Sequence, residues 1–568
     1  MAGISSLPDS TNKFQPEKYG SKNLWVFCAF WLFVFILYLP TARAGLVGDF
    51  PGWVTFLNSV KFIDYINRKG SGIASMYQFT QTVTYIFYKL WGANAWLWHL
   101  LFVTMQAVNA LLLFTFCSTL FHRSGTRNVT IAAFTGSLLF CSSPYISEVV
   151  VWEPSFHYLL GLMLMLIVLH ATQQYLIRPH KKYLWSGAVT FLLSTYSLEV
   201  FYLTPFFTVL LIVFYTTAAN ADKKVVRNAV LYCLLPQVII FVGHFVVLQI
   251  IYHESVAHIT ADSVQANATN LSKAVKYIFH LLLLGRFWEP ELRSKVYHYC
   301  EQTPTLVIAY GIVAAALIFI FTRYRRLGNP ARATSLLFIC TLLSIALILP
   351  LWFPDSGIVI YDRYAYVLAA FWSMLVAAWV NSIAGKKVFI CITAVYLLVN
   401  IRFTHKANAY WQQSAQVVNT LLKTFPNDPT KKMLLLNLPE CLEGVQMVGT
   451  RDDGEFRMMY NAVMPQKVTN EIYDVEAFYM RHPNDGATIT VLNDSMANVT
   501  LNDWGRWWVY YGLGATSYEN ADFKVDMKDQ GHQYNIILKH PANEYKVLYM
   551  AGGAWKTVDW SKKNIAQY

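Results

Sequence analysis

Acidic residues stand at the ends of several long apolar runs in this sequence, where a charge would meet a lipid–water boundary. Asp49 follows the first apolar run, and Glu148 and Glu153 lie in a short segment between two later ones. Glu199 separates another pair of runs. Ionisable groups near lipid cost free energy and are functional candidates by default. Because a carboxylate can take a proton from an attacking hydroxyl, we predict four catalytic residues: Asp49, Glu148, Glu153 and Glu199.

Basic side chains accompany these acids. Arg363 follows Asp362 in the sequence DRYAYVL, at the start of another apolar run. The planar fork of an arginine suits a phosphate at the level of lipid headgroups. Residues 274–284 are apolar but too few to cross a bilayer, so we expect them to be re-entrant or interfacial, with basic residues at their borders that attract a lipid phosphate. The predicted substrate-binding residues are Arg363, Tyr364, Arg286, Lys273 and His157.

Each of these residues also has a purely structural interpretation. Asp362 would pair with Arg363 or cap the following helix. Glu148 would be an ordinary solvated loop residue. Glu153 and His157, four residues apart, would support one another across a helical turn. The tryptophans near the same boundary are expected as interface anchors, since such aromatic belts are common; they are Trp152, Trp352 and Trp411.

The elements that position these residues are membrane helices. The 568 residues are 55% hydrophobic and 14% charged, against about 25% charged in a typical soluble protein. This composition excludes a large soluble enzyme, a disordered chain and a small disulfide scaffold. Apolar runs near the length that crosses about 30 Å of hydrocarbon predict eleven spans, at 24–42, 95–121, 129–147, 157–177, 184–200, 203–219, 229–251, 304–322, 334–352, 364–382 and 387–402.

The loop charges predict the orientation of these spans. One set of connecting segments holds 17 Lys and Arg against three acids, while the opposite set before Arg402 holds 11 against 12. Excess Lys and Arg mark the cytoplasmic side, so the N-terminus is expected inside and the C-terminal region outside. A cleaved signal peptide ending near Ala44 is the alternative for the first span. Basic residues placed by topology do not imply nucleic acid, and every predicted site residue falls at the outer face.

The region after the last span is expected to be a separate domain. Two domains are predicted, a transmembrane catalytic domain at 1–407 and an extracytoplasmic domain at 408–568. Residues 431–439 and 534–540 have the pattern of strands, and 506–512 are ambiguous. We therefore expect a small α/β domain of about 130 residues. None of the eight cysteines has metal-ligand spacing, although Cys300 and Cys441 lie outside the spans and could pair.

Several motifs together resemble the GT-C glycosyltransferase superfamily. They are the acid after the first span, the sequence YQFTQTVTYIFYKLWGANAWLWHLLFVTMQAVNALLLF from Tyr77, and DRYAYVL before a late span. The likeness is greatest to protein O-mannosyltransferases of the transmembrane, tetratricopeptide-repeat-containing type. Leu198-Glu199 stands where that family has Lys-Glu, and Asp362-Arg363-Tyr364 where it has Glu-Arg-Tyr. Residues 408–411 match an Asn-x-x-Trp pattern.

The resemblance implies roles for these residues and leaves others open. Asp49 would be the general base for the acceptor hydroxyl, Glu148 and Glu199 would shape the site, and Arg363 would contact the donor phosphate. The chain departs from the family in having one acid rather than two adjacent acids after the first span, and in lacking the repeats. Asp49, Glu148 and Glu153 would either act alone or gather around a divalent cation such as Mg²⁺ or Mn²⁺.

The leading functional hypothesis is therefore an inverting GT-C-type glycosyltransferase of a bacterial inner membrane, facing the periplasm. Its donor would be a polyprenyl-phosphate- or polyprenyl-diphosphate-linked sugar or glycan, and its acceptor a hydroxyl on protein Ser/Thr or on a glycan. The alternative is a transporter or flippase that binds a lipid-linked glycan without chemistry. A structural membrane component whose outer domain recruits partners is a third hypothesis.

Overall fold

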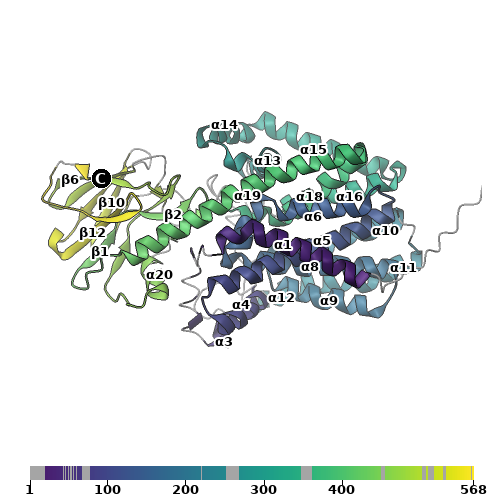
Figure 1. Ribbon diagram of the computed structural model, residues 1–568, viewed down its shortest axis with the longest axis horizontal. Coiled ribbons are helices and arrows are strands. Elements are labelled where there is room, and N and C mark those ends of the chain that lie inside the picture. Colours follow the sequence, from purple (N-terminus) through teal and green to yellow (C-terminus); the bar gives the residue numbers. More distant parts are fainter. Residues whose placement is uncertain are drawn as a thin grey trace, which may run out of the picture.

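Long helices run side by side through the larger part of the molecule, and β-sheets form the smaller part at one end (Figure 1). The structure is a computed structural model. It describes residues 19–42, 77–218, 221–247, 268–346, 361–448, 455–501, 517–528 and 533–563, with short pieces at 44, 47–48, 50, 54, 57–58, 61–66, 249–250, 349, 507–508 and 566–567.

The helices of the bundle follow the apolar runs of the sequence. Their bounds are α1 (Tyr19–Tyr38), α5 (Ala95–Ser124), α6 (Val129–Cys141), α7 (Ser147–Val151), α8 (Phe156–Ile177), α9 (Lys181–Thr195), α10 (Thr204–Thr217), α11 (Lys223–Ala229), α12 (Leu235–Val247), α15 (Thr303–Arg323), α16 (Asn329–Ala346), α18 (Tyr366–Ile383) and α19 (Lys386–Lys423). Within the described ranges, nine helical segments are long and apolar enough to cross a membrane. The chain is thus a polytopic membrane protein.

Two of the eleven predicted spans have irregular counterparts. The predicted span 129–147 is the pair Val129–Cys141 and Pro144–Val151, which bends by 55° and makes a tenth crossing if counted as one. The predicted span 184–200 is α9, which has only 15 residues. Because α8 runs away from the bundle end that holds Glu153 and α10 begins near Glu199 at that same end, α9 carries the chain back along the bundle (Figure 1).

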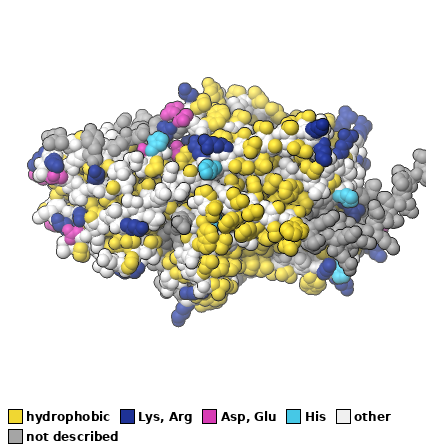
Figure 2. Space-filling view, viewed as in Figure 1, with side chains coloured by type: hydrophobic (Ala, Val, Ile, Leu, Met, Phe, Trp, Pro, Cys, Tyr) yellow, Lys and Arg dark blue, Asp and Glu magenta, His cyan; other side chains and the backbone are white. Residues whose placement is uncertain are grey.

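Capping residues fix where helix α5 starts and stops. The Asn94 side chain accepts the backbone N–H groups of Trp96 and Leu97 at 3.1 and 3.3 Å. At the other end Gly125 adopts φ 68°, a left-handed conformation that glycine tolerates best. Figure 2 shows apolar side chains across the visible bundle surface, with Lys and Arg gathered at the end away from the β-sheets.

Shorter helices lie at the bundle end nearest the β-sheets. They are α3 (Phe62–Ile66), α4 (Gln78–Trp91), α13 (Ala268–Leu283) and α14 (Pro290–Glu301). Helix α4 buries Thr80, Thr84 and Tyr88 while Ile86 and Leu90 are exposed, as expected for an amphipathic helix at a membrane interface.

The C-terminal region, predicted as a small α/β domain, is rich in β-structure. Its strands are β1 (Lys432–Leu435), β2 (Leu438–Leu442), β3 (Val445–Gln446), β4 (Ile472–Asp474), β5 (Ala477–Met480), β6 (Ala487–Asn493), β7 (Met496–Leu501), β8 (Trp507–Trp508), β9 (Tyr518–Glu519), β10 (Phe523–Lys528), β11 (Gln533–Leu538), β12 (Tyr545–Ala551), β13 (Ala554–Thr557) and β14 (Ala566–Gln567). The strand predicted at 534–540 corresponds to β11, while the range 431–439 is divided between β1 and the start of β2; α20 (Glu455–Val463) is the one α-helix described after α19.

Three sheets organise the residues after α19, which we call the outer domain because they lie beyond one end of the bundle (Figure 1). Their strand orders are β13-β12-β1-β4, β14-β6-β7-β11-β10-β9 and β3-β2-β5-β8. β1 pairs in parallel with both β12 and β4, while the six-stranded sheet is antiparallel between consecutive hairpin strands such as β6 and β7. This arrangement requires few helices, because hairpins rather than helical crossovers make most of the connections.

Helix α19 joins the bundle to the outer domain without a break. Its 38 residues cross the predicted boundary at 407/408. Beyond that point Trp411, Val418 and Leu421 are buried. The helix therefore still buries apolar side chains after its long apolar run has ended. Asn408 donates to the Leu37 carbonyl at 2.9 Å, which ties the helix back to α1.

Candidate functional site

The predicted site residues gather where several bundle helices begin, at the end facing the outer domain. Glu148 lies in α7, Glu153 opens the 3₁₀ turn Glu153–Ser155 before α8, and Glu199 opens the 3₁₀ turn Glu199–Leu203 before α10. Asp362 and Arg363 lie in the 3₁₀ turn Asp362–Ala365 that leads into α18. These turns at helix starts bring polar side chains from distant parts of the chain to one level of the bundle.

Arg363 is held by Glu148 in two ways. The Arg363 backbone N–H donates to Glu148 Oε2 at 2.7 Å, and its guanidinium forms an ion pair with Glu148 Oε1. The Glu148 side chain is buried, while that of Arg363 is 16% exposed. The interpretation of Glu148 as a solvated loop residue is therefore wrong.

Aromatic rings enclose the same guanidinium. The carbon at its centre lies 4.4 Å from the Tyr361 ring centroid, 5.2 Å from Trp152 and 5.3 Å from Tyr364. Cation–π contacts of this kind hold a guanidinium by its faces. With one edge bound to Glu148, the partly exposed remainder can meet an anion.

Asp362 pairs with Arg286 rather than with its neighbour Arg363. The Arg286–Asp362 ion pair is almost completely buried. Arg286 also donates to the Glu443 carbonyl of the outer domain at 3.2 Å, and its own carbonyl accepts from Arg293 at 2.6 Å. The structural interpretation in which Asp362 pairs with Arg363 is thus corrected, because adjacent residues of the 3₁₀ turn engage different partners.

The segment predicted at 274–284 lies beside this pair. It belongs to α13, a helix outside the candidate spans, and Tyr277 donates to the Tyr361 carbonyl at 3.2 Å. Lys276 is buried and bonds to Glu301 at 2.7 Å, and Lys273 is buried as well. Burial and the charges of nearby cations lower the pKa of His280 well below its usual range, so this ring is neutral.

Glu199 and His157 share a tyrosine. The Tyr77 hydroxyl donates to both carboxylate oxygens of Glu199, each at 3.1 Å. The Tyr77 ring stacks on His157 with centroids 5.7 Å apart. On the other side Tyr158, next to His157, lies edge-on to Tyr364 at 6.5 Å. A continuous wall of rings thus connects Glu199 with the surroundings of Arg363.

Glu153 is buried in an apolar setting. Glu153 is 6% exposed, and its Oε2 atom has no hydrogen-bond partner within the described part of the chain. A buried carboxyl oxygen without a partner is costly. Glu153 is therefore available to interact with a further group.

Asp49 lies outside the described residues, but residues on both sides of it are placed. The Gly48 N–H donates to the Met447 carbonyl at 2.7 Å, and Trp152 Nε1 donates to the Val47 carbonyl at 3.1 Å. Phe50 is buried against Trp98, with ring centroids 5.8 Å apart. The chain on the N-terminal side of Asp49 therefore contacts Trp152, which lies over Arg363.

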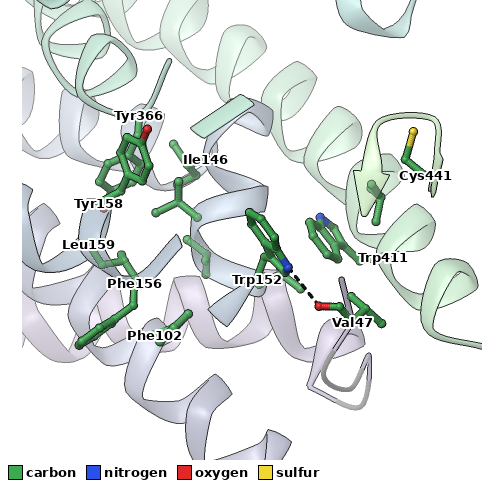
Figure 3. Packing of buried hydrophobic residues seen from close by; sticks show 14 of the residues in the cluster. Val47, Phe102, Ile146, Trp152, Phe156, Tyr158, Leu159, Tyr366, Trp411 and Cys441 are labelled. Carbon is green, nitrogen blue, oxygen red and sulfur yellow. Dashed lines mark hydrogen bonds between the residues drawn. The ribbon is translucent and has the colours of Figure 1, made fainter. Parts of the chain in front are cut away.

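The tryptophans have a different role from the one predicted. Trp152 and Trp411 are 5% and 1% exposed, so they are core residues and not interface anchors; Trp352 is outside the described residues. Figure 3 shows the two rings near each other, with Trp411 on the side of the strand that carries Cys441 and Trp152 bonded to Val47. The sequence pattern missed this because a tryptophan beside an apolar run looks the same whether it faces lipid or a neighbouring domain.

The described residues, which do not include Asp49, contain no group of three or more His, Cys, Asp or Glu that could hold a metal ion. Cys300 and Cys441, considered as a pair from the sequence, are both buried, and the Cys441 thiol forms no disulfide. Tyr361 and Glu443 were not predicted as site residues. Their signal in the sequence is weak: Tyr361 precedes DRY, and Glu443-Gly444 is a short turn signal between apolar strands.

No protein-family model matches the chain, and no curated protein matches it. Two similar solved structures are crystal structures of ArnT from Cupriavidus metallidurans, in the apo state and bound to undecaprenyl phosphate. They are 14% and 13% identical, with TM-scores of 0.35 and 0.33, and each comparison covers 81% of this chain and 93% of the other. Both TM-scores are below 0.5, so the likeness is too loose to assign a residue or an activity.

Proposed function

We propose that this protein is a GT-C-type glycosyltransferase. It would transfer a sugar or glycan from a polyprenyl-phosphate- or polyprenyl-diphosphate-linked donor to a hydroxyl on a protein or glycan, at the periplasmic face of a bacterial inner membrane. The observation that carries the proposal is the setting of Arg363, a partly exposed guanidinium fixed by Glu148 and three aromatic rings at the end of an apolar bundle. Buried carboxylates lie at the same level.

The donor would be recognised by its phosphate and its chain together. An arginine fork forms paired hydrogen bonds with phosphate oxygens, and the fixed position of Arg363 means that little side-chain entropy is lost on binding. Helix α13 contacts Tyr361 through Tyr277 and exposes Leu282 and Leu283, while Lys273 and Lys276 of this helix and Arg286 just after it are buried. An apolar surface next to cations fits a lipid phosphate at the membrane boundary.

The reaction would be a direct displacement. The acceptor oxygen forms a bond to the anomeric carbon while the bond from that carbon to the phosphate oxygen breaks, so the configuration inverts. Asp49 takes the proton of the acceptor hydroxyl as general base. The phosphate leaves with the electron pair, and Arg363 stabilises its added negative charge. Glu153 and Glu199 are assigned to the acceptor side, where Tyr77 orients Glu199.

A matched pair of ligands tests donor recognition. Polyprenyl phosphate and the corresponding polyprenol share the same chain and differ only in the phosphate. The wild type should bind the phosphate much more tightly, and Arg363→Ala should lose most of that difference. Arg363→Lys should lie between them, because it keeps the charge but not the fork. Arg323→Ala is the control, because it removes an arginine at the last residue of α15, at the end of the bundle away from Arg363. Equal affinity of wild type and Arg363→Ala for the phosphate would remove the basis of the proposal.

A further inference from the structure

One β-hairpin of the outer domain contacts the bundle at both of its ends. Strands β2 and β3 pair antiparallel through Cys441–Gln446 and Leu442–Val445, and we name residues 438–447 the inner hairpin. Its turn consists of Glu443 and Gly444, with φ angles of 47° and 82°. The left-handed conformation is ordinary for Gly444 but uncommon for a residue like Glu443. Such conformations persist only where the surroundings hold them.

The turn end of the inner hairpin contacts Arg286. The Glu443 carbonyl accepts from Arg286 Nη2 at 3.2 Å. The Glu443 carboxylate accepts from the Tyr479 hydroxyl at 3.3 Å and lies 3.8 Å from Arg481 Nε. Arg286 also forms the buried ion pair with Asp362. A single residue, Arg286, therefore connects the turn to Asp362 and its neighbour Arg363.

The other end of the inner hairpin contacts Gly48. The Met447 carbonyl accepts the Gly48 N–H at 2.7 Å, and Gly48 has φ 63°. A Cβ atom there would lie 3.0 Å from Trp152 Nε1 and 3.3 Å from Gln446 Cβ. Trp152 in turn lies over Arg363. Figure 3 shows Trp152, Val47 and the strand that carries Cys441 close together around Trp411.

Two lines of contact therefore start at opposite ends of one hairpin and meet at adjacent residues. One runs from Glu443 through Arg286 to Asp362, and the other from Met447 through Gly48 and Trp152 to Arg363. We infer that the inner hairpin is a positioning element for the donor-phosphate arginine, so that the outer domain sets the geometry of a site formed by the bundle. This inference rests on the proposed function, because it takes Arg363 as the phosphate ligand.

Simple docking of the two domains would not require these features. Ser414 already fixes the hairpin to α19 by donating to the Gln446 carbonyl at 2.8 Å, and Arg481 bonds to Glu289 of the bundle side at 2.9 Å. A left-handed glutamate and a glycine with no room for a side chain add nothing to such anchoring. They are needed if the carbonyls of Glu443 and Met447 must stay in place.

Two glycine variants give the first test. Gly48→Ala should push Trp152 or the hairpin aside, whereas Gly125→Ala introduces the same backbone strain, at φ 68°, in open space at the opposite end of α5. We expect Gly48→Ala to raise the dissociation constant for labelled polyprenyl phosphate by about tenfold to a hundredfold, because misplacing a positioned group by about 1 Å can cost about a hundredfold. Gly125→Ala should change the dissociation constant by less than about twofold, although its melting temperature should change by about as much as that of Gly48→Ala.

Two variants of Glu443 give a test that does not depend on Gly48→Ala folding. Glu443→Gly and Glu443→Val both lose the carboxylate, but only valine opposes the left-handed turn. Glu443→Val should weaken binding of polyprenyl phosphate at least about fivefold more than Glu443→Gly, as expected if the turn carbonyl holds Arg286. Equal effects of the two substitutions, or a Gly48→Ala variant that binds like Gly125→Ala, would overturn the inference. A wild type that does not prefer polyprenyl phosphate over polyprenol would instead overturn the proposed function, and the positioning role with it.

Discussion

Glu148 binds Arg363 through both of its oxygens, one at the backbone N–H and one at the guanidinium, although the two residues are 215 positions apart. The pair fixes the start of α18 to α7 and sets the direction in which the arginine points. The Glu148–Arg363 pair therefore contributes both to the stability of the bundle and to the position of the cation proposed to bind substrate.

A double-mutant cycle on Glu148 and Arg363 should show strong coupling. Removing one member of a buried ion pair typically costs about 3–5 kcal/mol, because it leaves the other charge without its partner. The double variant Glu148→Ala, Arg363→Ala should therefore lose less free energy of unfolding than the two single variants lose together. Unfolding by SDS titration in mixed micelles measures this free energy, and additive effects would contradict the pairing.

Asp49→Asn should reduce turnover without preventing donor binding. A neutral amide is a very poor base, and general-base catalysis contributes about 10²–10⁴-fold. Glu153→Gln should reduce turnover less, because the proposed proton transfer is assigned to Asp49 and not to Glu153. Transfer rates and affinity for polyprenyl phosphate should be measured on the same purified variants. Near-normal turnover in Asp49→Asn with a large loss in Glu153→Gln would move the base assignment to Glu153.

Tyr77→Phe should weaken the Glu199 side of the site. The substitution keeps the ring that stacks on His157 and removes the hydroxyl that donates to both oxygens of Glu199. A hydrogen bond to a charged group is worth about 1.5–3 kcal/mol, and a neutral one about 0.5–1.5 kcal/mol. Tyr88→Phe, which loses one bond to Asn58 in the same region, is the control. Unfolding measurements that give Tyr88→Phe the larger loss would contradict this geometry.

Glu476 should make the outer domain less stable as the pH rises. It is 3% exposed, neither carboxylate oxygen has a hydrogen-bond partner in the described structure, and burial raises its pKa well above the usual value. The folded state therefore holds a proton that the unfolded state releases above about pH 4.3. The contribution of Glu476 to the free energy of unfolding is therefore fully present below that pH and is lost as the pH rises toward the pKa of folded Glu476. Between the unfolded and the folded pKa, the loss is about 1.4 kcal/mol per pH unit.

The matching variant is Glu476→Gln, which keeps the size of the side chain and removes the charge. Its melting temperature should equal or exceed that of the wild type near pH 8, while the two proteins should converge near pH 4. Differential scanning calorimetry across this range provides the measurement. A wild type that becomes more stable relative to Glu476→Gln on raising the pH would show that Glu476 has an unrecognised cationic partner.

The sequence predicted most of the bundle because a bilayer imposes length and apolarity on each span. It could not predict the end of α19, since the charged residues Arg402 and Lys406 stop the apolar run but not the helix. It also placed Glu148, Glu199 and Arg363 at one level from loop charge. The partner of Asp362 could not be predicted, because Arg286 is 76 positions away and reaches it only through the packing of α13 against the bundle.

The outer domain was harder to predict for a physical reason. Its short strands alternate weakly, and parallel pairs such as β1 with β12 arise from contacts far apart in the sequence. The left-handed Glu443 is likewise set by its neighbours and not by its own preference. The roles of Asp49, Glu153 and the buried lysines of α13 remain predictions that the variants above address.

The most direct measurement follows a labelled lipid-linked sugar donor with purified wild-type protein in detergent micelles, where no compartments or gradients exist. A transferase given an acceptor hydroxyl consumes the donor, forms a labelled product of inverted anomeric configuration and releases polyprenyl phosphate or diphosphate, and Arg363→Ala should form little product. A protein that binds the donor with Arg363-dependent affinity but leaves it intact with every protein and glycan acceptor offered would contradict the glycosyltransferase account and favour a transporter of lipid-linked glycans.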